Sequence, residues 1–295
     1  MNLFKYLAIV SCVLCSAFAI ATPTQNYQDF LTKMENVELW DKAQHDLFSQ
    51  KSWQYWMSVK SEVNDAPNKF STMINRYHQL QAKHPRPYHI DVIRFQSSIE
   101  QFERFDDRNS PIKDATLFVG SSSIVYWKTA QFFPDYAVIN RGFGGASIGE
   151  IEYFYDEVIK RHNPKNVVLY SDIDIENGVE PAIAVANHIR LITRIEQDFP
   201  NANIMILDMK PTLVDFILGK NVRANKIQAN KLLKKFANAR SQRHYIDVTS
   251  AMVAKTGKLN GTLFLDDGMH LNDKGYQAWQ PLITDVLHQI KATRH

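Results

Sequence analysis

The feature that most constrains the fold is an alternation of short apolar runs with longer amphipathic stretches, from residue 113 to the C-terminus. The apolar runs predict strands at residues 115–119, 137–139, 166–170, 203–207 and 245–248. The amphipathic stretches predict helices at residues 148–161, 181–198, 223–240 and 273–291. Because apolar strands alternate with helices, we expect a parallel sheet covered on both faces. This doubly wound α/β fold binds its ligands beyond the carboxyl ends of the strands.

The segment that precedes this pattern, residues 22–110, is predicted to be helical. Its apolar side chains recur at helical spacing after Asn26, a predicted N-cap, and again after the break at Pro85 and Pro87. The segment also carries three bulky apolar side chains, Trp40, Trp53 and Trp56. We expect its aromatic side chains to pack against the α/β domain, which we place at residues 111–295. A ligand-binding role for them is the alternative.

The first residues, 1–21, have the pattern of a secretory signal peptide. Lys5 supplies a positive charge, an apolar run follows, and small residues at A-x-A spacing predict cleavage before Ile20 or Thr22. A retained membrane anchor is the alternative, but the run is shorter than the ~20 apolar residues that a span needs. The sequence therefore predicts a periplasmic or secreted protein, with no stable membrane span after processing.

Cysteine content and charge exclude several classes of function. The two cysteines, Cys12 and Cys15, both lie in the predicted signal peptide. The processed chain would then have no disulfide, no thiol nucleophile and no cysteine-based metal site. The formal net charge is +3, with acidic and basic residues interspersed. Because no basic run with interleaved aromatic residues is present, we do not expect nucleic acid as a partner.

A serine-rich segment, Gly120–Trp127, directly follows the first predicted strand. Glycine lets the chain turn sharply as it leaves the strand. A serine in that turn would lie at a helix N-terminus, where backbone N–H groups and the helix dipole favour a developing anion. The alternative is a plain helix cap, because serine is a common N-cap residue.

A second polar segment, Asp266–Asn272, lies in a loop before the last predicted helix. A serine nucleophile needs a base, and the base needs a carboxylate to fix its tautomer. Asp267 and His270 supply both groups in one loop, and Gly268 between them allows a tight bend. The alternatives are a surface loop that only caps the next helix, or a metal site, for which no second histidine lies nearby.

A glycine-dense segment, Asn140–Ser147, follows the second predicted strand. Glycines there would let backbone N–H groups approach a substrate oxygen, as an oxyanion hole requires. The segment lacks the G-x-G-x-x-G spacing of a dinucleotide site, and no cofactor is implied. A plain turn is the alternative.

Taken in order, these three segments resemble blocks I, II and V of the SGNH hydrolases, a GDSL-like family, in a variant that has GSSS where others have GDSL. The resemblance covers about residue 95 to the C-terminus and implies a flavodoxin-like sheet. It leaves residues 26–87 unexplained, so the helical segment predicted above would be an N-terminal extension of the α/β domain. It also implies Ser122 as nucleophile, with Asp267 and His270 as the acid and base. The N–H groups of Ser122 and Gly145 would form the oxyanion hole, with Gly144 as the second choice after Gly145.

Block III departs from the family pattern. The family reads roughly Y-A-G-x-N-D there, and its asparagine donates a third hydrogen bond to the oxyanion. In the matching stretch, Tyr170–Gly178, an isoleucine, Ile173, stands where the asparagine belongs. Losing one such donor typically costs ~10²–10³ in turnover. Asp172 would repel the oxyanion if it pointed into the hole, and Asn177 is an alternative donor.

The resemblance predicts an exported serine esterase that cleaves acyl esters, including acetyl esters, of small molecules or carbohydrates. A non-catalytic SGNH-fold binding protein is the main alternative, because the block III asparagine is missing. An assembly factor that acts through the aromatic helical region is a further alternative.

Overall fold

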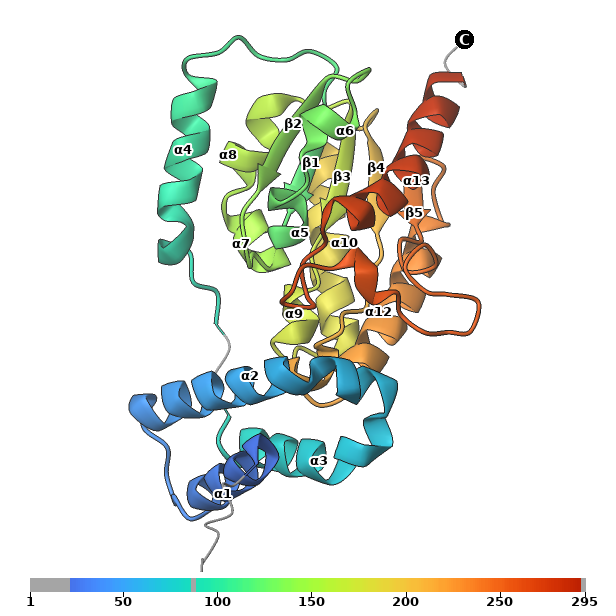
Figure 1. Ribbon diagram of the computed structural model, residues 1–295. Helices are drawn as coiled ribbons and strands as arrows, with labels where there is room; N and C mark the ends of the chain where they lie inside the picture. The colour runs from blue at the N-terminus through green and yellow to red at the C-terminus, as the bar shows by residue number, and fades with distance from the viewer. Residues whose placement is uncertain (1–21, 86–88, 293–295) are drawn as a thin grey trace, which may run out of the picture.

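The computed structural model describes residues 22–85 and 89–292, so the predicted signal peptide lies outside the described residues. The centre of the molecule is a parallel sheet in the order β2-β1-β3-β4-β5 (Figure 1). Its strands are β1 (Thr116–Gly120), β2 (Val138–Gly142), β3 (Asn166–Tyr170), β4 (Asn203–Leu207) and β5 (Arg243–Ile246). This confirms the predicted α/β fold and the flavodoxin-like strand order. β1 lies one residue later than predicted, β2 begins one residue later and ends three residues later, and β5 lies two residues earlier.

Helices cover both faces of the sheet. Leu117, Val167 and Ile204 point to one face, and Phe118, Val168 and Met205 point to the other, as successive strand residues must. The first face is covered by α4 (Gln96–Asp106), α7 (Ile148–Tyr153), α8 (Tyr155–Val158), α10 (Pro181–Asp198) and α12 (Val222–Ala237). The second is covered by α5 (Ser122–Val125), α6 (Thr129–Phe132) and α13 (Asp273–Ala292).

Short turns of helix complete the α/β domain. They are the 3₁₀ turns η1 (Ile93–Phe95), η2 (Lys160–His162) and η3 (Gly261–Leu263), and the single turns α9 (Ile173–Glu176) and α11 (Asp215–Leu218). The helix predicted for residues 148–161 is interrupted, because α7 ends at Tyr153 and α8 begins two residues later. Among the helices of the described residues, none is both long and apolar enough to cross a membrane.

The N-terminal helices form a unit with its own aromatic core. They are α1 (Pro23–Glu35), α2 (Lys42–Asp65) and α3 (Pro67–Lys83). The prediction that Asn26 caps the first helix is wrong. Thr22 is the N-cap, and its side chain accepts a hydrogen bond from the N–H of Gln25 at 3.2 Å. Pro23 explains the earlier start, because proline favours the first helical position.

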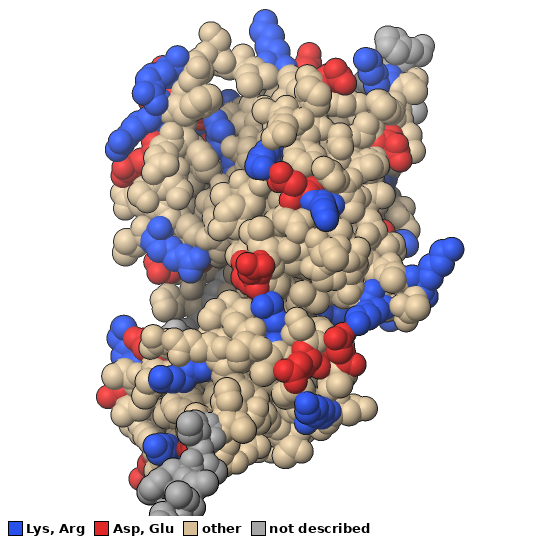
Figure 2. All heavy atoms as spheres, viewed as in Figure 1, with Lys and Arg blue, Asp and Glu red and all other residues tan. Residues whose placement is uncertain are grey.

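This unit packs against loops beyond the carboxyl ends of the strands, below the sheet in Figure 1. Trp56 is fully buried and contacts Phe216 edge-on, with ring centroids 5.4 Å apart. Tyr77 donates its hydroxyl proton to the carbonyl of Ile217 at 2.9 Å. Trp56 therefore packs against the α/β domain, as predicted for the aromatic side chains, whereas the side chain of Trp53 is 39% exposed. Acidic and basic side chains are interspersed over the face that Figure 2 shows.

Candidate active site

The end of β1 fixes the position of the serine-rich turn. Gly120 has a φ of +153°, and a Cβ there would lie 1.9 Å from the carbonyl oxygen of Tyr170 on β3. Only glycine fits this close approach of two backbones. The chain turns immediately afterwards, so Ser121 is the N-cap of α5 and Ser122 is its first residue. Ser122 therefore lies at the carboxyl edge of the sheet.

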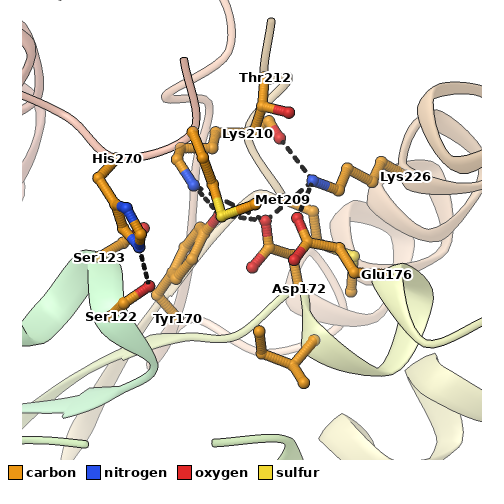
Figure 3. A network of polar contacts seen from close by, with 12 residues as sticks. Ser122, Ser123, Tyr170, Asp172, Glu176, Met209, Lys210, Thr212, Lys226 and His270 are labelled. Carbon is orange, nitrogen blue, oxygen red and sulfur yellow. Dashed lines mark hydrogen bonds and ion pairs between the residues drawn. The ribbon is translucent and has the colours of Figure 1, made fainter. Parts of the chain in front are cut away.

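The structure brings Ser122, His270 and Asp267 into one chain of hydrogen bonds. The Oγ atom of Ser122 lies 3.0 Å from Nε2 of His270 (Figure 3). The Nδ1 atom on the other side of the ring lies 2.6 Å from Oδ2 of Asp267. The hydroxyl, imidazole and carboxylate are thus aligned in the order that general-base activation of a serine requires.

The loop Asp267–His270 is rigidly organised around its own carboxylate. Oδ1 of Asp267 accepts the N–H groups of Met269 at 2.8 Å and His270 at 2.9 Å. Gly268, with a φ of +68°, makes the tight bend. Burial acts to raise the pKa of Asp267, but the hydrogen bonds from His270 and Met269 outweigh it and hold that pKa below its ordinary value. Asp267 therefore stays charged beside the imidazole.

Two further segments border the serine. The Tyr126 ring meets the His270 ring edge-on, with centroids 4.9 Å apart. The glycine turn after β2 lies on another side, where a Cβ on Gly144 would be 3.9 Å from Cβ of Ser122. Asn140 ties β2 to this region, because its amide donates to the carbonyl of Ile124 at 2.8 Å. The structure therefore places all the predicted site residues, including Gly144 and Gly145, in one region.

One known protein family matches most of the α/β domain. The sequence pattern of the GDSL-like Lipase/Acylhydrolase family matches residues 122–278, which is more than half of the 295 residues. The chain belongs to this family. The match begins at Ser122 and includes the loop with Asp267 and His270, whereas α1–α4 lie outside it.

Solved structures share the GDSL-like fold. A protein described as a platelet activating factor from Streptococcus pneumonia aligns with a TM-score of 0.60 and 21% identity, over 66% of this chain and 94% of that one. A protein described as an acylhydrolase from Bacteroides fragilis aligns with a TM-score of 0.57 and 20% identity, over 68% of this chain and 99% of that one. A GDSL-like lipase from Bacteroides thetaiotaomicron aligns with a TM-score of 0.54 and 16% identity, over 68% and 98%. No curated protein matches the chain.

In the altered block III of this GDSL-like protein, the carboxylate of Asp172 is part of a buried cluster of ion pairs. Asp172 is 2% exposed and accepts hydrogen bonds from the Tyr170 hydroxyl at 2.8 Å and Lys226 Nζ at 3.0 Å (Figure 3). Burial opposes its ionisation, but the charges of Lys226 and Lys210 outweigh burial and hold the pKa of Asp172 well below its ordinary value. The charge of Asp172 is therefore balanced by the two lysines.

Lys226 is the centre of this cluster. Its ammonium group, only 1% exposed on α12, also contacts Glu176 at 2.7 Å, Asp215 at 3.1 Å and the carbonyl of Lys210 at 3.2 Å. A buried ammonium is stable only with such partners, because desolvation of an unpaired charge is costly. The cluster joins α9, α11, α12 and the end of β4 into one support beneath the site.

Asn177 does not replace the missing block III donor. Its amide donates to the carbonyl of Ile173 at 3.0 Å, and the residue is exposed at the end of α9. Sequence reasoning missed the roles of Lys210 and Lys226. Lys210 lies in the Met209–Thr212 turn after β4. Lys226 has a signal in the sequence, because it is at helical spacing with Val222 and Ala229 on the buried stripe of α12, whereas the other lysines of this helix are exposed. Among the described residues, no cluster of His, Cys, Asp and Glu side chains has the form of a metal site.

Proposed function

We propose that this GDSL-like protein is an exported serine esterase that hydrolyses acyl esters. The observation that carries the proposal is the hydrogen-bonded relay from the Ser122 hydroxyl through His270 to Asp267, at 3.0 Å and 2.6 Å. Family membership supports the reaction class, since the family is one of lipases and acylhydrolases. The signal-peptide pattern of residues 1–21 supports export to the periplasm or the medium.

In this mechanism, the Ser122 hydroxyl attacks the ester carbonyl while Nε2 of His270 takes its proton. Asp267 holds the ring with Nδ1 protonated and stabilises the imidazolium. The imidazolium then protonates the departing alcohol, which leaves an acyl group on Ser122. Water, deprotonated by His270, releases the acid and restores the serine.

The N–H groups of Ser122 and Gly145 would stabilise the oxyanion that forms in each step. Within the described residues, neither N–H donates to a protein acceptor. With Ile173 in the place of the third donor, we expect turnover below that of a hydrolase with a complete hole, by ~10²–10³. The ion pairs of Asp172 with Lys226 and Lys210 support the proposal that the protein is catalytic. They balance the negative charge of Asp172, which would otherwise repel the oxyanion.

We propose acetyl and other short acyl esters of small molecules or carbohydrates as the substrate class. This rests on the family and on the position of Ser122, which is half-buried at the carboxyl edge of the sheet. A non-catalytic binding protein is the second candidate, and the observation that favours it is Ile173 in block III.

Hydrolysis of p-nitrophenyl acetate by the purified chain, compared with Ser122→Ala, tests the proposal. We expect the variant to lose the activity and to keep the thermal stability of the wild type. Ser123→Ala is the matched control, because the Ser123 hydroxyl is buried with no hydrogen-bond partner among the described residues. It should keep the wild-type rate. Equal rates for wild type and Ser122→Ala would support the binding protein instead.

A further inference from the structure

The glycine turn beside Ser122 has a defined conformation. The N–H of Ala146 donates to the carbonyl of Phe143 at 3.1 Å, which closes a β-turn with Gly144 and Gly145 at its centre. Gly145 has a φ of +81°. A positive φ of about 80° at the third position is the mark of a type II turn, whereas a type I turn has about −90° there. The two types differ by a flip of the central peptide, here the one that joins Gly144 to Gly145.

A residue outside the family match contacts this peptide. Arg94, in the 3₁₀ turn η1, places Nη2 3.3 Å from the carbonyl oxygen of Gly144 and 3.3 Å from that of Gly145. In a planar trans peptide the C=O of one residue and the N–H of the next point in opposite directions. The Gly144 carbonyl points to Arg94, so the Gly145 N–H points away from it.

We propose that Arg94 is a positioning residue that holds the Gly144–Gly145 peptide in the type II orientation. This orientation presents the N–H of Gly145 to the oxyanion formed at Ser122. In the flipped turn the Gly144 carbonyl would take that place, and its partial negative charge would repel the oxyanion. The inference rests on the proposed esterase function and adds to it a role for the segment before the family domain.

The surroundings of Arg94 fit this role. Its guanidinium lies over the Phe95 ring, 4.4 Å from the centroid, and Phe95 is buried. The segment is fastened to α7, because the N–H of Asp91 donates to Oε1 of Glu150 at 3.0 Å. The other oxygen of Glu150 accepts the N–H of Ser147, directly after the glycine turn, at 2.8 Å. Arg94 and the turn are therefore held in register by one carboxylate.

The missing block III donor makes this orientation more important here. With Ile173 in that place, the hole depends on the N–H groups of Ser122 and Gly145. A flip that removes one of them would leave a single donor. A side chain at Gly145 would be strained by the positive φ, and its Cβ would lie 2.2 Å from Nη2 of Arg94 and so displace the guanidinium from the turn.

Steady-state kinetics of Arg94→Met and Arg94→Lys on p-nitrophenyl acetate test the proposal. We expect Arg94→Met to lower kcat by ~10–100-fold, a little less than full removal of one donor. KM should change less than about twofold, because the donor acts on the charge of the transition state. Arg94→Lys should recover part of kcat, since an ammonium still donates to a carbonyl. Arg104→Met is the control, because Arg104 forms an exposed pair with Glu100.

A crystal structure of Arg94→Met provides the readout that does not depend on activity. We expect φ of Gly145 to become negative as the central peptide flips. A turn that keeps its positive φ would overturn the proposal whatever the rate, and so would a flipped turn with an unchanged kcat. An inactive wild type would contradict the proposed esterase function instead, and the structure of the variant would still decide whether Arg94 orients the turn.

Discussion

The Nζ atom of Lys226 lies 3.0 Å from Oδ2 of Asp172, with both side chains almost completely buried. This pair explains how the chain accommodates a charged residue in block III next to the proposed oxyanion hole. The family asparagine is replaced by Ile173, and the neighbouring carboxylate is neutralised by an ammonium group from another helix. Ion pairs with Lys226 on α12 therefore hold the altered block III in place within the domain.

Replacing Lys226 by methionine should destabilise the protein strongly. Asp172, Glu176 and Asp215 would lose their shared partner, and breaking a buried ion pair by removing one member typically costs ~3–5 kcal/mol. The free energy of unfolding in urea measures the loss. Lys231→Met, at an exposed position of the same helix, is the control and should change stability by less than about 0.5 kcal/mol. A similar small effect of both substitutions would contradict the structural role of Lys226.

Glu176→Gln should change how stability depends on pH. Burial, together with the charge of Asp172, raises the pKa of Glu176 to about 7 from its ordinary value of 4.5. The folded state therefore binds this proton more tightly than the unfolded state. The contribution of Glu176 is fully favourable below pH 4.5 and is lost as the pH rises to about 7.

Glutamine does not titrate, so the variant should gain stability relative to wild type between pH 5 and pH 8. Urea unfolding of both proteins at the two pH values measures the difference. Glu180→Gln, at an exposed position nearby, should show no such change. If the wild type instead became more stable relative to the variant as the pH rises, the predicted direction of the pH dependence would be wrong.

Gly120→Ala should prevent folding of the α/β domain. The added methyl group would lie 1.9 Å from the Tyr170 carbonyl, and both backbones belong to the central strands. Gly178→Ala is the matched comparison, because Gly178 also has a positive φ, +82°, but nothing lies within 4 Å of its Cβ position. That variant should lose only ~1–2 kcal/mol of stability, because an alanine is strained at a positive φ. Soluble yield and circular dichroism distinguish the two, and a folded Gly120→Ala would refute the steric argument.

Asp267→Asn should lower kcat by about 10⁴-fold, the effect of the same change in a comparable triad. An asparagine amide facing Nδ1 favours the tautomer with the proton on Nε2, so His270 could no longer accept the Ser122 proton. The measurement is kcat on p-nitrophenyl acetate, with the melting temperature as a check on folding. Asp266→Asn, the exposed neighbour, should keep the wild-type rate. A loss below tenfold at Asp267 would leave the relay without a catalytic role.

The sheet could be predicted from the sequence because its three central strands, β1, β3 and β4, are mostly apolar and completely buried. β3 and β4 have the predicted limits, whereas β5 begins earlier, at Arg243. Its first residues are only half-buried, and the arginine is held by Glu196 at 2.6 Å. A search for apolar runs cannot find a strand residue that is held by an ion pair, so it missed the start of β5. The N-cap Thr22 was missed for a similar reason, because side-chain capping and Pro23, rather than a pattern of apolar residues, fix the start of α1.

The site residues Ser122, Asp267 and His270 could be proposed from short motifs because each motif is local. The contacts of Arg94 and Lys226 could not, because they join segments far apart in the chain. Arg94 lies 50 residues before Gly144, and Lys226 lies 54 residues after Asp172. Only the fold shows that these cations meet the glycine turn and block III.

The docking of α1–α3 onto the loop before α11 has a consequence for biogenesis. Asn64 donates to the carbonyl of Leu213 at 2.7 Å, across 149 residues of sequence. The N–H of Leu213 in turn donates to the carbonyl of Gly268, in the loop that holds His270, at 2.9 Å. Val214 and Ile217 belong to the core of the N-terminal helices, so this core cannot be fully covered until about three quarters of the chain has left the ribosome. Contacts of such long range are formed late and slowly. A chain that ends before that point would leave this aromatic core exposed to water, and exposed apolar surface of this kind favours aggregation.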